Sequence, residues 1–60
     1  MNKLLSVQET AESLRLAKIT VYKMVSAKQI PFMKIGRRVL FDPSQLKEWL
    51  DDKTVSPLTN

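Results

Sequence analysis

The strongest constraint on how this chain folds is a change of hydrophobic period between two prolines. The residue before a proline is pushed towards extended geometry, so Ile30-Pro31 ends the helical pattern that precedes it. Asp42-Pro43 begins a new helix, because Asp is a good N-cap and proline suits the first helical position. Between them, residues 32–41 change to the alternating pattern of strands on both sides of Gly36, the one glycine in the chain. These signals predict a short hairpin with helices on both sides.

Three helices are predicted outside this hairpin. Ser6 and Glu9 have the spacing of a capping box, which predicts a first helix over residues 7–14. A second periodic segment covers residues 17–27, and a third helix is predicted from Pro43 to residue 51 or 52. The third helix has apolar residues at helical spacing that we expect in the core: Leu46, Trp49 and Leu50. Residues 53–60 have little periodicity, so a flexible tail is expected after a domain of residues 1–52.

The second helix is predicted to be amphipathic. At about 100° per residue, one arc is wholly apolar and consists of Ala17, Val21, Met24 and Val25. The opposite arc is basic and aromatic with one apolar member, and consists of Lys18, Ile19, Tyr22, Lys23 and Ser26. Thr20 lies on the boundary between the arcs. We expect the apolar arc to pack on the body and the basic arc to face outwards.

Two registers are open to the hairpin. A three-residue loop, Gly36-Arg37-Arg38, pairs Ile35 with Val39 and makes one side of the hairpin apolar. A two-residue loop, Gly36-Arg37, pairs Ile35 with Arg38 and mixes the two faces. Because register follows the buried face, the three-residue loop is predicted. In both registers the two arginines lie at the tip.

The basic charge is concentrated in the middle of the chain. Seven cations and no acid lie between positions 15 and 41, namely Arg15, Lys18, Lys23, Lys28, Lys34, Arg37 and Arg38. The segments before and after this block are net negative, and the whole chain carries +4. A solvated lysine-rich surface is the simplest alternative, but the block coincides with the second helix and the hairpin. This basic footprint favours double-stranded DNA as the partner.

Composition excludes several other classes of function. The chain has no Cys and no His, so it can build neither the usual zinc site nor a His- or Cys-based catalytic dyad. We therefore expect no cofactor and no enzymatic activity. The longest apolar runs are too short to span a bilayer, so no membrane partner is expected. With double-stranded DNA as the expected partner, these exclusions lead us to expect a cytoplasmic, nucleoid-associated binding protein.

The predicted order of helix, tight turn, helix, hairpin and helix is that of a winged helix-turn-helix, a mainly α fold with a small β-hairpin. The second helix of such a unit enters the DNA major groove, and the hairpin is a wing that reaches an adjacent groove or the backbone. The candidate DNA contacts on this recognition helix are Lys18, Ile19, Thr20, Tyr22 and Lys23. The candidates in the turn and the wing are Arg15, Lys34, Arg37 and Arg38.

Several candidates have more than one interpretation. Lys18 and Lys23 can meet guanine O6 and N7 or simply phosphate. Ile19 is either an ordinary surface residue or an apolar contact to a thymine methyl group. Thr20 can bond a phosphate or the backbone of its own helix. The residues alone leave these alternatives open.

The sequence also resembles the excisionase-family, MerR-like winged helix-turn-helix domains. Residues 5–11 resemble the opening motif L-S/T-V-x-E-A/V-A, and residues 20–23 resemble the T-V-Y-R/K core. The I-P and K-I-G of residues 30–36 resemble the wing motif, and residues 48–50 resemble the closing E-W-L. The resemblance covers about residues 4–50. It departs at Arg15 and Lys28, where the family usually or often has Gly, and at Ala17, where it has Ser or Thr.

The resemblance implies a small sequence-specific DNA-binding protein of the excisionase, or recombination directionality, type. Such a protein binds and bends DNA with an integrase or recombinase as partner. The alternatives are a transcriptional regulator of the same fold and a DNA-targeting module of a larger assembly. The resemblance also implies that the Tyr22 hydroxyl points at a phosphate, where the alternative is a half-buried Tyr that donates to backbone. No long heptad follows the third helix, so we expect a monomer that becomes cooperative on adjacent DNA sites.

Overall fold

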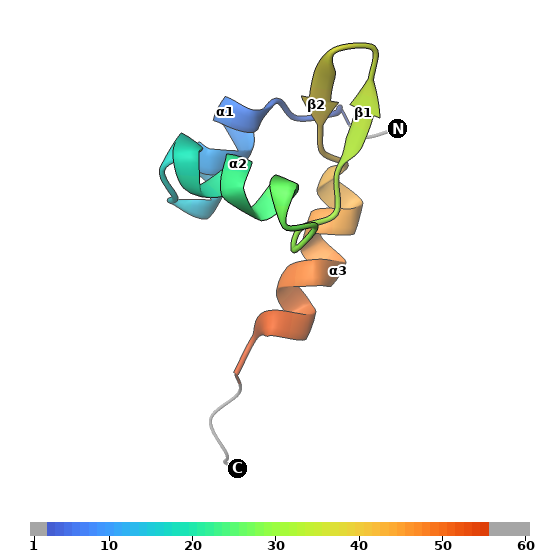
Figure 1. The fold of residues 1–60 in the computed structure, drawn as a ribbon. Helices are drawn as coiled ribbons and strands as arrows, with labels where there is room; N and C mark the ends of the chain where they lie inside the picture. Colours follow the sequence, from blue (N-terminus) through green and yellow to red (C-terminus); the bar gives the residue numbers. More distant parts are fainter. Residues whose placement is uncertain (1–2, 56–60) are drawn as a thin grey trace.

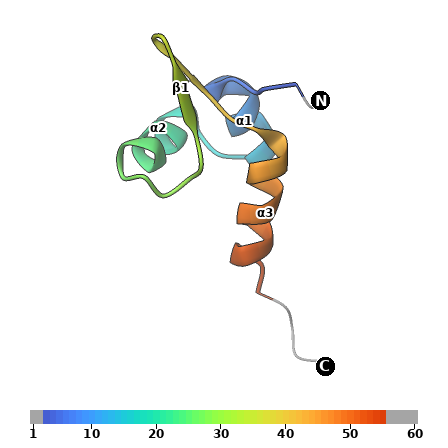
Figure 2. The ribbon, with the colours of Figure 1, turned by 90° about the vertical axis from the view of Figure 1, so that its right-hand side faces the viewer.

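The computed structural model describes residues 3–55, which form three helices and one two-stranded antiparallel hairpin (Figure 1). The elements are α1 (Val7–Leu14), α2 (Lys18–Ser26), β1 (Met33–Ile35), β2 (Arg38–Leu40) and α3 (Pro43–Lys53). The hairpin and α3 extend from the body in opposite directions (Figures 1 and 2). This is the mainly α, winged helix-turn-helix architecture that the sequence predicts. No helix among the described residues is long and apolar enough to cross a membrane.

The predicted helices are confirmed to within a residue or two at each end. The capping box at the start of α1 is present, with the Ser6 hydroxyl accepting from the Glu9 amide at 3.1 Å and the Glu9 carboxylate accepting from the Ser6 amide at 2.9 Å. The Asp42 carboxylate caps α3 by accepting from the Ser44 amide at 2.9 Å. Helix α3 runs to Lys53, slightly beyond the predicted end. Most of the predicted tail, from residue 56 to 60, lies outside the described residues.

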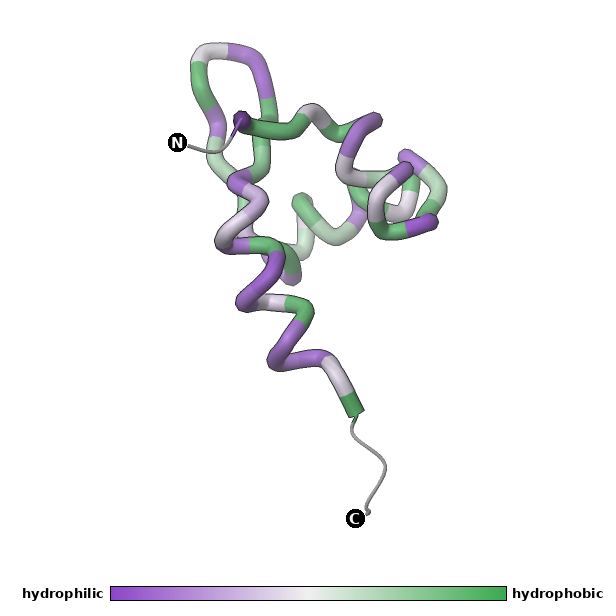
Figure 3. The backbone as a smooth tube through the Cα atoms, turned by 180° about the vertical axis from the view of Figure 1, so that it is seen from behind, coloured by the Kyte–Doolittle hydropathy of each residue, from purple (hydrophilic) through white to green (hydrophobic). Residues whose placement is uncertain are grey.

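The core forms where α1, α2, the hairpin base and α3 meet. Its buried apolar side chains are Val7, Ala11, Val21, Ile30, Phe41 and Leu46. The apolar arc of α2 is centred on Val21, which is fully buried, whereas Ala17 is the exposed N-cap of the helix. On α3, Leu46 is buried, Trp49 packs half-buried against the core and Leu50 is 41% exposed. The outer part of α3 is mostly hydrophilic (Figure 3), so the core contacts come from its first turns.

The predicted hairpin register is wrong, and the two-residue loop is the one that forms. Ile35 pairs with Arg38, and Lys34 pairs with Val39. The prediction assumed that one face of the hairpin is buried, but Ile35 is 55% exposed and Lys34 is exposed. Burial therefore does not select the register. The loop does, because Gly36 has a φ of 63° at the first loop position, which is the glycine-first pattern of tight two-residue hairpins.

The N-terminal segment adds a contact that the sequence pattern did not predict. Leu5 forms an isolated antiparallel bridge with Phe41, with N–H···O distances of 2.8 and 2.9 Å in the two directions. Phe41 is fully buried and directly follows β2. The bridge fixes the base of the wing to the residues that lead into α1.

Helix α1 ends in a Schellman motif built around Arg15. Arg15 is left-handed, with φ 58° and ψ 42°. Its amide donates to the Glu12 carbonyl at 3.2 Å, and the Leu16 amide donates to the Ala11 carbonyl at 2.9 Å. These bonds satisfy carbonyls at the helix end and turn the chain within three residues into α2.

Helix α2 ends in the same way around Lys28. Lys28 has a φ of 56°, its amide donates to the Val25 carbonyl at 3.0 Å, and the Gln29 amide donates to the Met24 carbonyl at 2.8 Å. Arg15 and Lys28 are the two non-glycine residues with positive φ in the described chain. They stand at the two positions where the resembling family usually or often has Gly. Each costs on the order of 1 kcal/mol, because an L side chain is strained in this region.

Replacing either strained residue by glycine should stabilise the fold. We expect Arg15→Gly and Lys28→Gly each to raise the free energy of unfolding by about 1 kcal/mol in urea denaturation. Ala27→Gly is the matched control, because Ala27 has an ordinary φ of −85° and its replacement should lower stability by about 0.5–1 kcal/mol. Equal losses at all three positions would contradict strain at Arg15 and Lys28. If Arg15 contacts DNA, as the sequence predicts, Arg15→Gly should also weaken DNA binding slightly, because it removes a cation.

Removal of the buried Thr10 hydroxyl should also stabilise the fold. Thr10 is fully buried on α1, and its Oγ1 has no hydrogen-bond partner. The position is one where the resembling motif has Ala or Val. An unsatisfied buried hydroxyl loses its hydration without compensation, so Thr10→Val should raise the free energy of unfolding by about 1 kcal/mol and the melting temperature by about 4–8 °C. Thr10→Ser keeps the hydroxyl and loses a methyl group, so it should lower both. A less stable Thr10→Val protein would mean that the hydroxyl is satisfied in solution.

Candidate nucleic-acid interface

Helix α2 presents its basic arc to solvent because the opposite arc is anchored in the core. Val21 is fully buried, whereas Tyr22 is 47% and Ile19 is 63% exposed. Lys18 and Lys23 are exposed on the same side. The predicted recognition face is therefore an accessible surface, formed by residues three or four positions apart on one helix.

The N-terminus of α2 lacks a side-chain cap. Ala17 occupies the N-cap position in extended geometry and makes no side-chain hydrogen bond. Thr20 is half-buried, and its amide donates to the Ala17 carbonyl at 3.0 Å as part of the first turn. The boundary position predicted for Thr20 on the helix wheel agrees with this partial burial.

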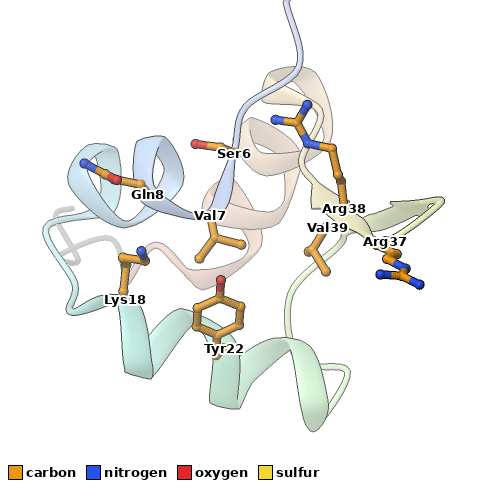
Figure 4. A pocket seen from close by; sticks show the side chains of 8 residues that line it. All are labelled: Ser6, Val7, Gln8, Lys18, Tyr22, Arg37, Arg38 and Val39. Atoms are coloured by element: carbon orange, nitrogen blue, oxygen red, sulfur yellow. The ribbon is translucent and has the colours of Figure 1, made fainter.

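The wing carries its cations on the loop and on both strands. Arg37 is in the two-residue loop, and Arg38 is the first residue of β2. Lys34 lies at the centre of β1, paired across the hairpin with Val39. All three basic side chains are exposed. In Figure 4 the guanidinium groups of Arg37 and Arg38 point in different directions, so the wing can meet charge on more than one side.

A depression between α2, the wing and the start of α1 brings part of the predicted site together (Figure 4). It has a volume of about 340 Å³ and is lined by Ser6, Val7, Gln8, Lys18, Tyr22, Arg37, Arg38 and Val39. The Tyr22 ring projects from α2 towards Val7. We refer to this surface as the α2–wing depression. It joins Lys18 and Tyr22 of the helix to the two wing arginines.

The other predicted site residues lie outside the depression. Ile19, Thr20 and Lys23 are on α2 but do not line it, and neither do Arg15 in the turn or Lys34 on β1. Conversely, Ser6 and Gln8 line the depression and were not predicted as site residues. The capping box marks the start of α1 in the sequence, but only the Leu5–Phe41 bridge places that start beside the wing.

The cations of this surface are electrostatically uncompensated within the described chain. No ion pair joins any of the seven central cations to a carboxylate among residues 3–55. The Tyr22 hydroxyl likewise has no hydrogen-bond partner there, which disfavours a Tyr that donates to backbone. The local field is therefore positive and directed outwards, as an anionic ligand requires.

One carboxylate near the depression is held in its charged form. The Ser6 amide that donates to Glu9 is the main cause of a pKa below the ordinary value of 4.5, and the Ser6 hydroxyl and the charge of Lys3 lower the pKa further. Desolvation acts in the opposite direction. The negative charge of Glu9 thus stabilises the N-terminus of α1, where the helix dipole favours an anion.

The comparison with protein families matches the chain to a known domain. A helix-turn-helix domain model matches residues 4–54, which is most of the chain and includes all five elements. Comparisons with curated proteins and with solved structures found no significant match.

The capping box should make stability depend on acidity. Because the pKa of Glu9 is lower in the folded state, its contribution is present at neutral pH and is lost as the pH falls below about 4.5 and through the folded-state pKa. Glu9→Gln retains an acceptor for the Ser6 amide but cannot titrate. We therefore expect the stability advantage of the wild type over Glu9→Gln at pH 7 to shrink by pH 3, measured by urea unfolding at both pH values.

Glu12→Gln serves as the control, since Glu12 lies on the same helix outside the capping box. Its difference from wild type should change less between the two pH values. If both variants showed the same pH dependence, the capping carboxylate would not be its source.

Proposed function

Since this chain belongs to the helix-turn-helix domain family, a family of DNA-binding domains, we propose that it is a sequence-specific DNA-binding protein of the excisionase type. It binds duplex DNA through α2 and the wing, bends it, and thereby helps an integrase or recombinase to assemble. The family is typically non-enzymatic, and strand chemistry in this proposal belongs to the partner.

One observation carries the proposal more than any other. Lys18 and Tyr22 of α2 line the same depression as Arg37 and Arg38 of the wing, and none of these side chains has a partner within the described chain. A phosphate backbone that passes between α2 and the wing would meet donors from both sides. Charge-assisted hydrogen bonds to phosphate are the dominant source of affinity in such interfaces.

The proposed roles divide between the two elements. On α2, Lys18, Lys23 and Thr20 contact base edges or phosphates in the major groove, and Tyr22 donates its hydroxyl to a phosphate. Arg15, in the turn before α2, contacts the flanking backbone. In the wing, Lys34, Arg37 and Arg38 contact the backbone or the adjacent minor groove, where narrow A·T tracts attract arginine. DNA that is bent towards the wing would satisfy both elements together.

Salt dependence of binding tests whether the cations contact DNA. For a duplex selected from a random library, each lysine or arginine that contacts phosphate should add about −0.9 to the slope of log K against log salt concentration. Lys23→Ala should lower the affinity and reduce the slope by about one if Lys23 contacts phosphate. Lys47→Ala is the matched control, because Lys47 is exposed on α3 within the acidic C-terminal segment and should change neither value. Absence of binding at low salt would contradict the proposal.

The bend separates the excisionase type from its alternative. Fluorescence energy transfer between the ends of the selected duplex should report a bend on the order of tens of degrees on saturation. The wing variant Arg37→Ala should bind with a smaller bend, because it removes one point of attachment. A straight complex with full affinity would instead favour a transcriptional regulator of the same fold.

A further inference from the structure

The most exposed large apolar side chain on α2 lies in the middle of its basic face. Ile19 is 63% exposed, although Val21, two residues away, is completely buried. Its neighbours on the outer arc are the exposed Lys18, Tyr22 and Lys23. An isoleucine in this place exposes apolar surface without contributing to the core.

The position of Ile19 on α2 determines which part of a DNA major groove it would contact. At about 100° per residue, the outer arc extends from Lys18 to Lys23, and its inner members are Tyr22, Ser26 and Ile19. The Tyr22 ring projects towards Val7 in the α2–wing depression. Ser26 is the last residue of α2, whereas Ile19 is the second. Recognition helices place their N-terminal residues against the base edges. If α2 enters the major groove as proposed above, Ile19 is the side chain that points most directly at the bases, with lysines on both sides of it.

The chemistry of isoleucine then limits what it can recognise. Its side chain has no hydrogen-bonding group, and the one apolar group that base pairs present in the major groove is the methyl group on C5 of thymine. A 5-methylcytosine carries the same group at the same ring position. We propose that Ile19 is a specificity-determining residue that recognises the C5 methyl group of a pyrimidine. This inference rests on the proposed DNA-binding function.

The methyl group can be removed without any other change to the DNA. The experiment first selects a duplex from a random library, then replaces each of its thymines in turn by uracil, which lacks only the C5 methyl group. Fluorescence anisotropy measures the affinity of each duplex for wild type and Ile19→Ala. At one position, uracil should weaken wild-type binding about fourfold, the amount expected for burial of one methyl group. The same replacement should have no effect on Ile19→Ala.

A second arm identifies the source of the methyl group. Placing cytosine and then 5-methylcytosine at the same position, opposite guanine, tests the methyl group on a different base. Tighter binding of the methylated duplex by wild type, with no difference for Ile19→Ala, would extend recognition to methylated cytosine. Equal binding of the two would restrict the proposed contact to thymine.

Ile35→Ala is the matched control, because Ile35 is the same residue type, is 55% exposed and lies on the wing outside α2. It should retain the uracil effect at the position that Ile19 recognises. Both isoleucines are exposed, so neither variant should unfold the chain, and circular dichroism verifies this. If no thymine gives a larger uracil effect with wild type than with Ile19→Ala, the inference is wrong while DNA binding stands. If no duplex binds, the proposed function itself is wrong.

Discussion

The arrangement of the helices and the wing depends on the burial of Phe41 and its bridge to Leu5. Phe41 is fully buried, and both of its backbone groups bond to Leu5. It ends the wing and immediately precedes Asp42, the N-cap of α3. A hairpin with only three residues per strand is marginal by itself, so its orientation must come from its base. The position of the wing arginines relative to α2 is therefore set by the Leu5–Phe41 bridge, which lies at the end of the hairpin opposite the loop.

The same small core supports features that favour binding over stability. Arg15 and Lys28 each place a basic side chain where glycine would avoid strain, and Ala17 leaves the start of α2 without a side-chain cap. The central cations lack carboxylate partners within the described chain, so they repel one another. These costs fall beside or within the proposed DNA surface. Because DNA would bind the folded chain and relieve the repulsion, binding should stabilise the fold by mass action.

Local signals in the sequence were sufficient to predict the helices but not the register of the wing. Ser6 with Glu9, and Asp42 with Pro43, start α1 and α3 through bonds between near neighbours, which a sequence pattern can reveal. The predicted hairpin register was wrong because it was inferred from burial. Ile35 is largely exposed, and the turn at Gly36 sets the register instead. The Leu5–Phe41 bridge joins positions that are distant in sequence and has no periodicity, so Ser6 and Gln8 could not be predicted to lie beside the wing.

The size of the recognition surface has a consequence for specificity. Helix α2 has nine residues, and a single helix of this kind reads about three or four bases directly. A site that short recurs on the order of every few hundred base pairs, so one copy of this domain cannot single out one locus. The phosphate contacts proposed for the cations add affinity without adding information. In the proposed function, further specificity would come from deformation of the DNA by the wing and from several copies on adjacent sites.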